Sequence, residues 1–148
     1  DTNLTINWGD GVGFSSNSGN NPSYTYATAG TYQILISGSR QSIYDGYFTV
    51  NFNNTGSKLN IISIDQWGAT PYSTMANAFY GCSNLQGNAI DVPDLSSVTD
   101  MSSMFYNATS FNQDLSSWSV NGVTSCGNFS QNTPQWTEPK PTFTNYTP

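Results

Sequence analysis

The feature of this chain that most constrains its fold is a repeat of about 26 residues in its second half. Met75–Cys82 aligns with Met101–Ala108 at a shift of 26 residues, and Cys126–Phe129 follows 25 residues after Met101. A unit this short cannot bury its apolar side chains alone, so neighbouring units are expected to stack around one core. The residues expected to face that core are Met75, Phe79, Met101, Phe105 and Phe111.

Each unit is predicted to contain a short strand, a turn and a short helix, and the unit length falls in the range of leucine-rich repeats. The stretch Met101–Val120, MSSMFYNATSFNQDLSSWSV, resembles the BspA-like leucine-rich-repeat surface proteins, whose signature is Met-x-x-Met-Phe-x-x-Ala-x-x-Phe-Asn-x-x-Leu-x-x-Trp-x-Val. The flanking repeats depart from that signature, since Ala78 replaces its second Met and the third unit is shortened. The resemblance implies a short α/β leucine-rich-repeat-like solenoid over residues 59–148, with Trp136–Phe143 as its C-terminal cap. It also implies a bacterial surface protein that adheres or contacts other proteins and does not catalyse.

Residues 1–58 have a different pattern, typical of strands separated by turns. Apolar and polar residues alternate over Leu4–Trp8, Tyr24–Tyr26, Thr31–Ile36 and Ile43–Phe52, with a Ser/Asn/Gly-rich loop over Phe14–Pro22. Short strands at this spacing predict a small antiparallel β-sandwich with no helix.

Two motifs in this half carry a second resemblance. INWGDG at residues 6–11, followed by YTYATAGTYQI at residues 24–34, is similar to the PKD family. The resemblance implies an immunoglobulin-like β-sandwich of an extracellular protein, serving as a spacer, an adhesive module or a protein-contact module. The residues themselves favour Trp8 as a core anchor and Asp10 as a turn former.

The charge balance excludes several function classes. Lys and Arg number three against nine Asp and Glu, which gives a net charge of −6. Nucleic acids and anionic membrane surfaces need clusters of basic residues, so neither is an expected partner. No stretch approaches the roughly 18 apolar residues of a spanning helix, so membrane insertion is not expected either.

The chain has few residues of the types used in catalysis and metal binding. Histidine is absent, which removes the commonest general base and an easy zinc ligand. A glycosidase pair would have to come from aspartates that are better explained as turn and helix caps. These candidates are Asp65, Asp91, Asp94, Asp100 and Asp114. Calcium near Asp10 or Asp94 stays open against the same turn-forming interpretation. We therefore expect no enzyme activity and no cofactor.

Cysteines and glycosylation sequons leave alternatives open. Cys82 and Cys126 occupy different positions of their units, which favours two free thiols over a disulfide. Asn-x-Ser/Thr occurs at five candidate glycosylation sites, although chance supplies several in a chain where Asn, Ser and Thr make up 56 of 148 residues. These sites are Asn3, Asn53, Asn107, Asn128 and Asn145.

The ends of the chain suggest how copies would assemble. PKD-like sandwiches normally have a strand before the one that leads into the Trp-Gly-Asp-Gly turn, so the first strand, which begins by residue 4, is expected to leave an open edge. The extended C-terminal run is predicted to pair with the open edge of a neighbouring copy, giving a head-to-tail fibre. The alternatives are a trimmed chain or a tail folded back as the cap. This candidate inter-subunit tail consists of Thr142, Phe143, Thr144, Asn145, Tyr146 and Thr147.

Together these features predict a non-catalytic extracellular structural or adhesive protein, a subunit of a surface appendage or fibre. Its expected partners are further copies of itself, or a protein or glycan on a host or cell surface. The alternative is a carbohydrate-binding or protein-binding accessory module of a larger secreted protein. Burial of Trp67, Trp118 and Trp136 discriminates between them, because a sugar platform needs exposed aromatic rings.

Overall fold

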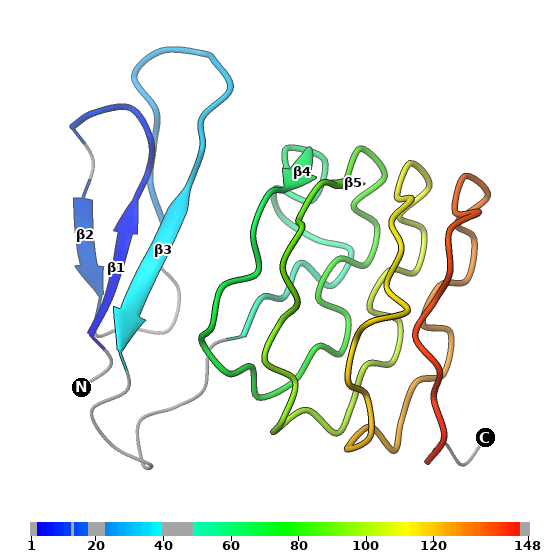
Figure 1. Ribbon diagram of the computed structural model, residues 1–148. Helices are drawn as coiled ribbons and strands as arrows, with labels where there is room; N and C mark the ends of the chain where they lie inside the picture. Colours follow the sequence, from blue (N-terminus) through cyan, green and yellow to red (C-terminus); the bar gives the residue numbers. More distant parts are fainter. Residues whose placement is uncertain (1–2, 13, 18–22, 40–48, 146–148) are drawn as a thin grey trace. The chain divides into compact units, whose positions relative to one another are not determined.

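The structure is a computed structural model that describes residues 3–12, 14–17, 23–39 and 49–145 (Figure 1). The chain divides into two compact units, Asp1–Gly46 and Tyr47–Pro148. The division lies before residue 58, where the sequence analysis ended the first domain. No helix among the described residues has the length and hydropathy needed to cross a bilayer.

The first unit contains one antiparallel sheet of three strands (Figure 1). Its strands are β1 (Asn3–Asn7), β2 (Phe14–Asn17) and β3 (Leu35–Ser39), in the order β2-β1-β3. Ile6 is buried and pairs with Ser15 on one side and Ile36 on the other. The turn after β1 holds Gly9 and Gly11 in the left-handed region, both at φ 83°, a conformation that glycine adopts at no steric cost.

The predicted β-sandwich is wrong, because the described residues of this unit form a single sheet. β2 lies inside the predicted loop Phe14–Pro22, and Tyr24–Tyr26 is not a strand. The alternating tyrosines have another role. The Tyr26 hydroxyl donates to the Trp8 carbonyl at 2.8 Å, and its ring stacks on Tyr32 with centroids 4.1 Å apart.

Two further strand predictions need correction in this region. β3 begins at Leu35, several residues later than the predicted start at Thr31. Of the predicted strand Ile43–Phe52, residues 43–48 lie outside the described residues and residues 49–52 are not in a strand.

The second unit is a stack of irregular coils, and we call it the coil stack. Backbone hydrogen bonds between coils join residues 22 to 26 positions apart, so each coil lies directly on the next (Figure 1). Within residues 49–145, regular strand is confined to β4 (Ser63–Ile64) and β5 (Gln86–Gly87), which pair in parallel. The offset of these bonds corresponds to the repeat in the sequence.

The helices predicted within each unit are absent, so the α/β leucine-rich-repeat-like solenoid is also wrong: residues 49–145 contain no helix. Met75–Cys82 instead forms three overlapping β-turns, in which the amides of Ala78, Tyr80 and Cys82 donate to the carbonyls of Met75, Asn77 and Phe79 at 3.1, 3.3 and 3.1 Å. The third residues of the first and last of these turns, Asn77 and Gly81, are left-handed at φ 57° and 77°. A left-handed residue every fourth position prevents a right-handed helix from propagating.

The same turn geometry recurs in the following coils. Asparagine tolerates left-handed backbone better than most residues, which explains its abundance at these positions. The left-handed residues of the later coils are Ser103, Asn107, Asn128 and Asn132, with φ between 54° and 58°.

Alternate backbone amides in these turns point to the next coil. The intervening amides close turns within their own coil, so backbone bonding is shared between the two directions. The amides of Met75, Asn77, Phe79 and Gly81 donate to the carbonyls of Asp100, Ser102, Met104 and Tyr106. The amides of Met101, Ser103, Phe105 and Asn107 donate in the same way to Ser125, Gly127, Phe129 and Gln131.

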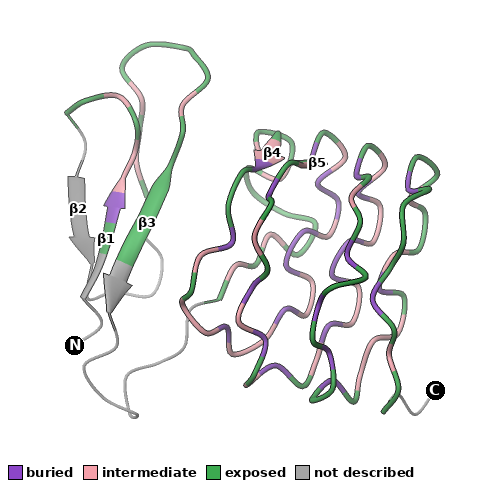
Figure 2. Cartoon of the chain, viewed as in Figure 1, coloured by how far each residue is buried: buried purple, intermediate pink, exposed green. Residues whose placement is uncertain are grey.

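The buried side chains of the coil stack form one cluster drawn from successive coils. The buried residues are coloured purple in Figure 2. All five residues expected to face the core are buried, at 0–2% exposure. Phe105 is at its centre, stacked on Phe79 and Phe111 with ring centroids 5.6 and 4.2 Å away. Trp67, Trp118 and Trp136 are also buried, at 5–6% exposure.

Candidate functional site

The C-terminal end of the coil stack carries a row of backbone amides that have no acceptor among the described residues. The amides of Cys126, Asn128, Ser130 and Asn132 stand 25 positions after those of Met101, Ser103, Phe105 and Asn107, which all donate to a following coil. In the described part of the chain, none of the four later amides donates a hydrogen bond. We call this surface the end face.

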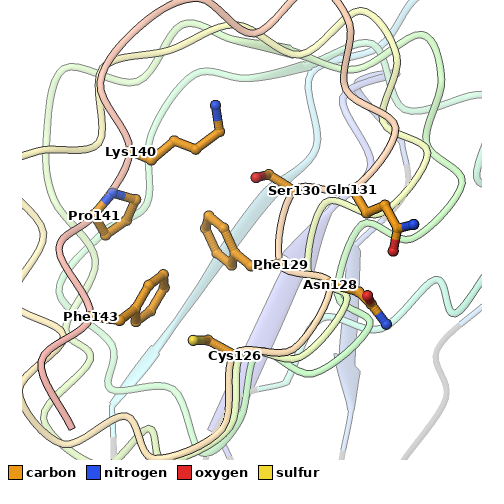
Figure 3. A pocket seen from close by; sticks show the side chains of 8 residues that line it. All are labelled: Cys126, Asn128, Phe129, Ser130, Gln131, Lys140, Pro141 and Phe143. Atoms are coloured by element: carbon orange, nitrogen blue, oxygen red, sulfur yellow. The ribbon is translucent and has the colours of Figure 1, made fainter. Parts of the chain in front are cut away.

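A shallow pocket of about 370 Å³ opens on the end face (Figure 3). It is lined by Cys126, Asn128, Phe129, Ser130, Gln131, Lys140, Pro141 and Phe143. Its apolar part comes from Phe129 and Phe143, with ring centroids 5.1 Å apart, and from the buried Pro141. Lys140 lies at the side, its Nζ 4.8 Å from the ring centroid of Trp136. The pocket therefore combines an apolar floor with backbone donors and a single cation.

The described part of the candidate inter-subunit tail belongs to this same surface. Phe143 packs on Phe129, and the Asn145 side-chain amide donates to the Asn121 carbonyl. Thr142–Asn145 is thus docked on its own coil stack, whereas Tyr146 and Thr147 lie outside the described residues. A role of the tail between subunits stays a prediction.

The five sequons lie in different environments. Asn3 is in β1, whereas Asn53, Asn128 and Asn145 are exposed and Asn107 is half-buried. Asn107 accepts a hydrogen bond at its Oδ1 from Asn132 Nδ2 at 3.0 Å. Left-handed backbone at Asn53, Asn107 and Asn128 gives those asparagines a structural role independent of any glycan. Glycosylation stays a prediction.

The aspartates considered for catalysis mostly bind backbone amides. Asp94, Asp100 and Asp114 each accept from the amide two residues later, at 3.0, 2.8 and 2.9 Å. Asp91 joins two coils by accepting from the amides of Trp67 and Gly68 at 2.9 and 2.8 Å.

The other two acidic side chains of interest are also engaged locally. Asp65 accepts from the Ser63 hydroxyl at 2.7 Å, and Asp10 accepts from the Val12 amide at 3.1 Å and from the Tyr24 hydroxyl. Bonds from the Ser116 side chain and then its amide lower the pKa of Asp114. Within the described ranges, no three His, Cys, Asp or Glu side chains gather in a way that would hold a metal ion. These contacts support the turn-forming interpretation.

Both cysteines are free thiols, as the sequence favoured. Cys82 is completely buried, and burial raises the pKa of its thiol to about 12, partly opposed by the charge of Lys58. Cys126 is only partly buried and lies in the end-face pocket, where burial also raises the pKa of its thiol. Cys126 is thus a chemical reporter of the end face.

Alkaline pH is expected to destabilise the fold through Cys82. Its thiol has a pKa of about 12 in the folded chain and an ordinary value of 9.0, so the unfolded chain loses the proton first. Between pH 9 and 12 the free energy of unfolding therefore falls as pH rises, by about 1 kcal/mol at pH 10. Urea denaturation at pH 7 and pH 10 measures this loss. Cys82→Ala should show a smaller loss and Cys126→Ala nearly the full one; equal losses in Cys82→Ala and the wild type would refute the assignment.

The first unit has a partly exposed aromatic cluster. Trp8 stacks on Tyr24 with centroids 5.3 Å apart, and Tyr24 meets Tyr26 edge-on at 5.0 Å. All three rings and Tyr32 are half-buried. Trp8 therefore packs within its unit while leaving part of the cluster accessible to solvent.

The comparisons with known proteins concern mainly the coil stack. The family model described as "Mycoplasma protein of unknown function, DUF285" matches residues 48–145, about two thirds of the chain. The chain belongs to the DUF285 family. No curated protein and no solved structure matches it. The DUF285 match begins within two residues of the second unit, so the family corresponds to the coil stack and includes the end face.

Sequence reasoning missed the end face as a site. The row of amides has no side-chain signature, because backbone donors are present in every residue except proline. The available signal was the recurrence of Asn77, Ser103 and Asn128 at the third position of successive units. Read as left-handed turn residues, they would have placed the amides of the last DUF285 unit in register with those before it.

Proposed function

We propose that this chain is a non-catalytic structural and adhesive module of an extracellular surface, acting as a subunit of a bacterial surface appendage or fibre. The observation that carries the proposal is the burial of Trp67, Trp118 and Trp136, at 5–6% exposure. These rings stabilise the scaffold and present no face on which a sugar could stack. The engagement of the aspartates in turns supports a module without catalytic carboxylates.

Hydrogen bonds made by uncharged side chains between neighbouring coils also fit a structural role. Ser102 and Ser125 hydroxyls lie 2.7 Å apart, and Thr49 and Ser73 hydroxyls 2.8 Å apart. Asn112 accepts at its Oδ1 from the amides of Thr137 and Glu138, at 2.9 and 3.0 Å. Such bonds do not titrate near neutral pH and are insensitive to salt, unlike ion pairs. They are suited to a protein exposed to changing external conditions.

Electron microscopy and bead adhesion together test the proposal. Purified chain at high concentration is expected to form filaments under negative stain, and beads coated with it should cluster or adhere to bacterial or host cells. Beads coated with heat-unfolded chain are the control. Separate particles, combined with beads that adhere no better than the control, would overturn the proposal.

A carbohydrate-binding module is the second candidate, favoured by the aromatic cluster of Trp8, Tyr24, Tyr26 and Tyr32. Partly exposed rings beside a carboxylate, here Asp10, are groups that bind neutral sugars. A glycan array tests this function. Binding that is lost in Tyr24→Ala and kept in Tyr106→Ala, a tyrosine of the coil stack, would support it over the scaffold role; absence of any binding would exclude the glycans tested.

A further inference from the structure

We infer that the end face binds the first coil of a second copy of this chain, the coil that contains Asn51, Asn53 and Thr55. Copies would then join head to tail, each adding its coil stack to the stack of the copy before it. This inference rests on the proposed structural function and specifies the contact by which the subunits join. The sequence predicted assembly through a released tail. Here the described part of the tail is docked, and its Phe143, with the preceding Lys140 and Pro141, lines the end-face pocket.

The occupant follows from the bonding inside the chain. The four amides of the end face repeat a row that is bonded, one coil earlier, to carbonyls at every second residue. The group that completes the end face is therefore a coil of the same kind, presenting carbonyls at that spacing. Within the chain this coil-to-coil contact is already made, and the end face is its continuation.

The chemistry of the row also fixes the direction of assembly. Two end faces present amide donors to each other and cannot bond these amides to one another, so the row of amides does not favour a symmetric dimer through two end faces. The partner surface must instead offer free carbonyls. The carbonyls of the inner coils are occupied by the coil before them.

The first coil supplies carbonyls of the required kind. Those of Asn51, Asn53 and Thr55 accept no hydrogen bond from any described residue. Between them, the Phe52 carbonyl closes a turn by accepting from the Thr55 amide at 2.8 Å. The Asn54 carbonyl accepts from Lys58 Nζ at 2.9 Å, so the free carbonyls of the first coil lie at every second residue. When two copies join through an end face and a first coil, one end face and one first coil of the pair stay free. Further copies can therefore add at both ends, which gives a fibre.

The test uses the full chain and compares two arginine substitutions. Ser130 lines the end-face pocket, and its side chain makes no hydrogen bond among the described residues, so Ser130→Arg blocks the face without removing an internal contact. Ser117→Arg makes the same change at an exposed position of an inner coil. In sedimentation velocity, the average mass of the wild type and Ser117→Arg should rise continuously with concentration. Association of Ser130→Arg should be at least tenfold weaker.

Mixing experiments test the direction of growth. Ser130→Arg keeps its first coil, so a small fraction of it should end growing wild-type assemblies and shorten them. Wild-type chain that stays monomeric, or stops at a dimer, would overturn the inference, as would normal assembly of Ser130→Arg. Adhesion of coated beads to cells, the second readout of the proposed function, does not require copies to bind one another, so the two failures are distinguishable.

Cys126 gives an independent readout that needs no variant. Its labelling by a maleimide should slow as wild-type concentration rises, because the next copy covers the pocket, while the buried Cys82 stays unreactive throughout. Assemblies that grow while Cys126 labels at its dilute rate would show that another surface is used and would overturn the inference.

Discussion

Phe105→Ala is expected to lower the free energy of unfolding of the coil stack by about 3–5 kcal/mol, the usual cost of removing a buried phenylalanine. Phe105 is completely buried and contacts the rings of Phe79, Phe111, Phe129 and Trp136, with centroid distances of 4.2 to 5.6 Å. Phe79, Phe129 and Trp136 come from neighbouring coils, so the cavity would weaken the contact between coils as well as the core. Urea denaturation followed by tryptophan fluorescence measures the change.

Ile90→Ala is the matched control, because Ile90 belongs to the same unit and its side chain is fully exposed. Its substitution should change the free energy of unfolding by less than about 0.5 kcal/mol. A loss below about 1 kcal/mol for Phe105→Ala would mean that the aromatic core does not hold the coils together.

The second large effect is expected at a left-handed turn residue. Asn107→Val should cost about 2 kcal/mol, because a β-branched side chain is strained at φ 58° and the hydrogen bond from Asn132 is lost. Asn107→Gly loses the same bond without the strain, so it should be at least about 1 kcal/mol more stable than Asn107→Val. The same denaturation experiment compares the two variants.

Asn121→Val makes the same chemical change at an exposed position that lacks a left-handed backbone. Its effect should be within about 0.5 kcal/mol of the wild type. If Val and Gly at position 107 were equally stable, the turn geometry of the coils would be incorrect.

The repeat and the core could be predicted from the sequence. The 26-residue self-alignment placed Met75 with Met101 and Phe79 with Phe105, and all four are buried. This succeeds because burial depends on apolar side chains at fixed intervals, which are directly visible in the sequence.

The local backbone of the units could not be predicted in the same way. An apolar residue every third or fourth position, as in Met101, Met104 and Phe105, is the pattern of an amphipathic helix. It is equally produced by consecutive four-residue turns, and the distinction lies in the φ angles of Ser103 and Asn107. Asn and Ser are only weakly unfavourable in helices, so their presence did not exclude one.

The strand prediction for Tyr24–Tyr26 in the first unit was wrong for a related reason. The alternation of Tyr24, Thr25 and Tyr26 is typical of a strand, but the rings are ordered by their contacts with other aromatic rings and by the bond from Tyr26 to the Trp8 carbonyl. A side-chain pattern of period two shows which residues share a side and does not show whether the backbone is paired with a neighbour. The row of amides on the end face could not be predicted either, because backbone groups leave no side-chain pattern in the sequence.

Hydrogen exchange at single amides, measured by NMR on dilute monomeric chain, tests most directly whether backbone bonds between coils hold this protein together. The amides of Met101, Ser103, Phe105 and Asn107 are predicted to be strongly protected, and those of Cys126, Asn128, Ser130 and Asn132 to exchange quickly, because only the first row has a following coil to bond. Equal protection of the two rows would contradict the account.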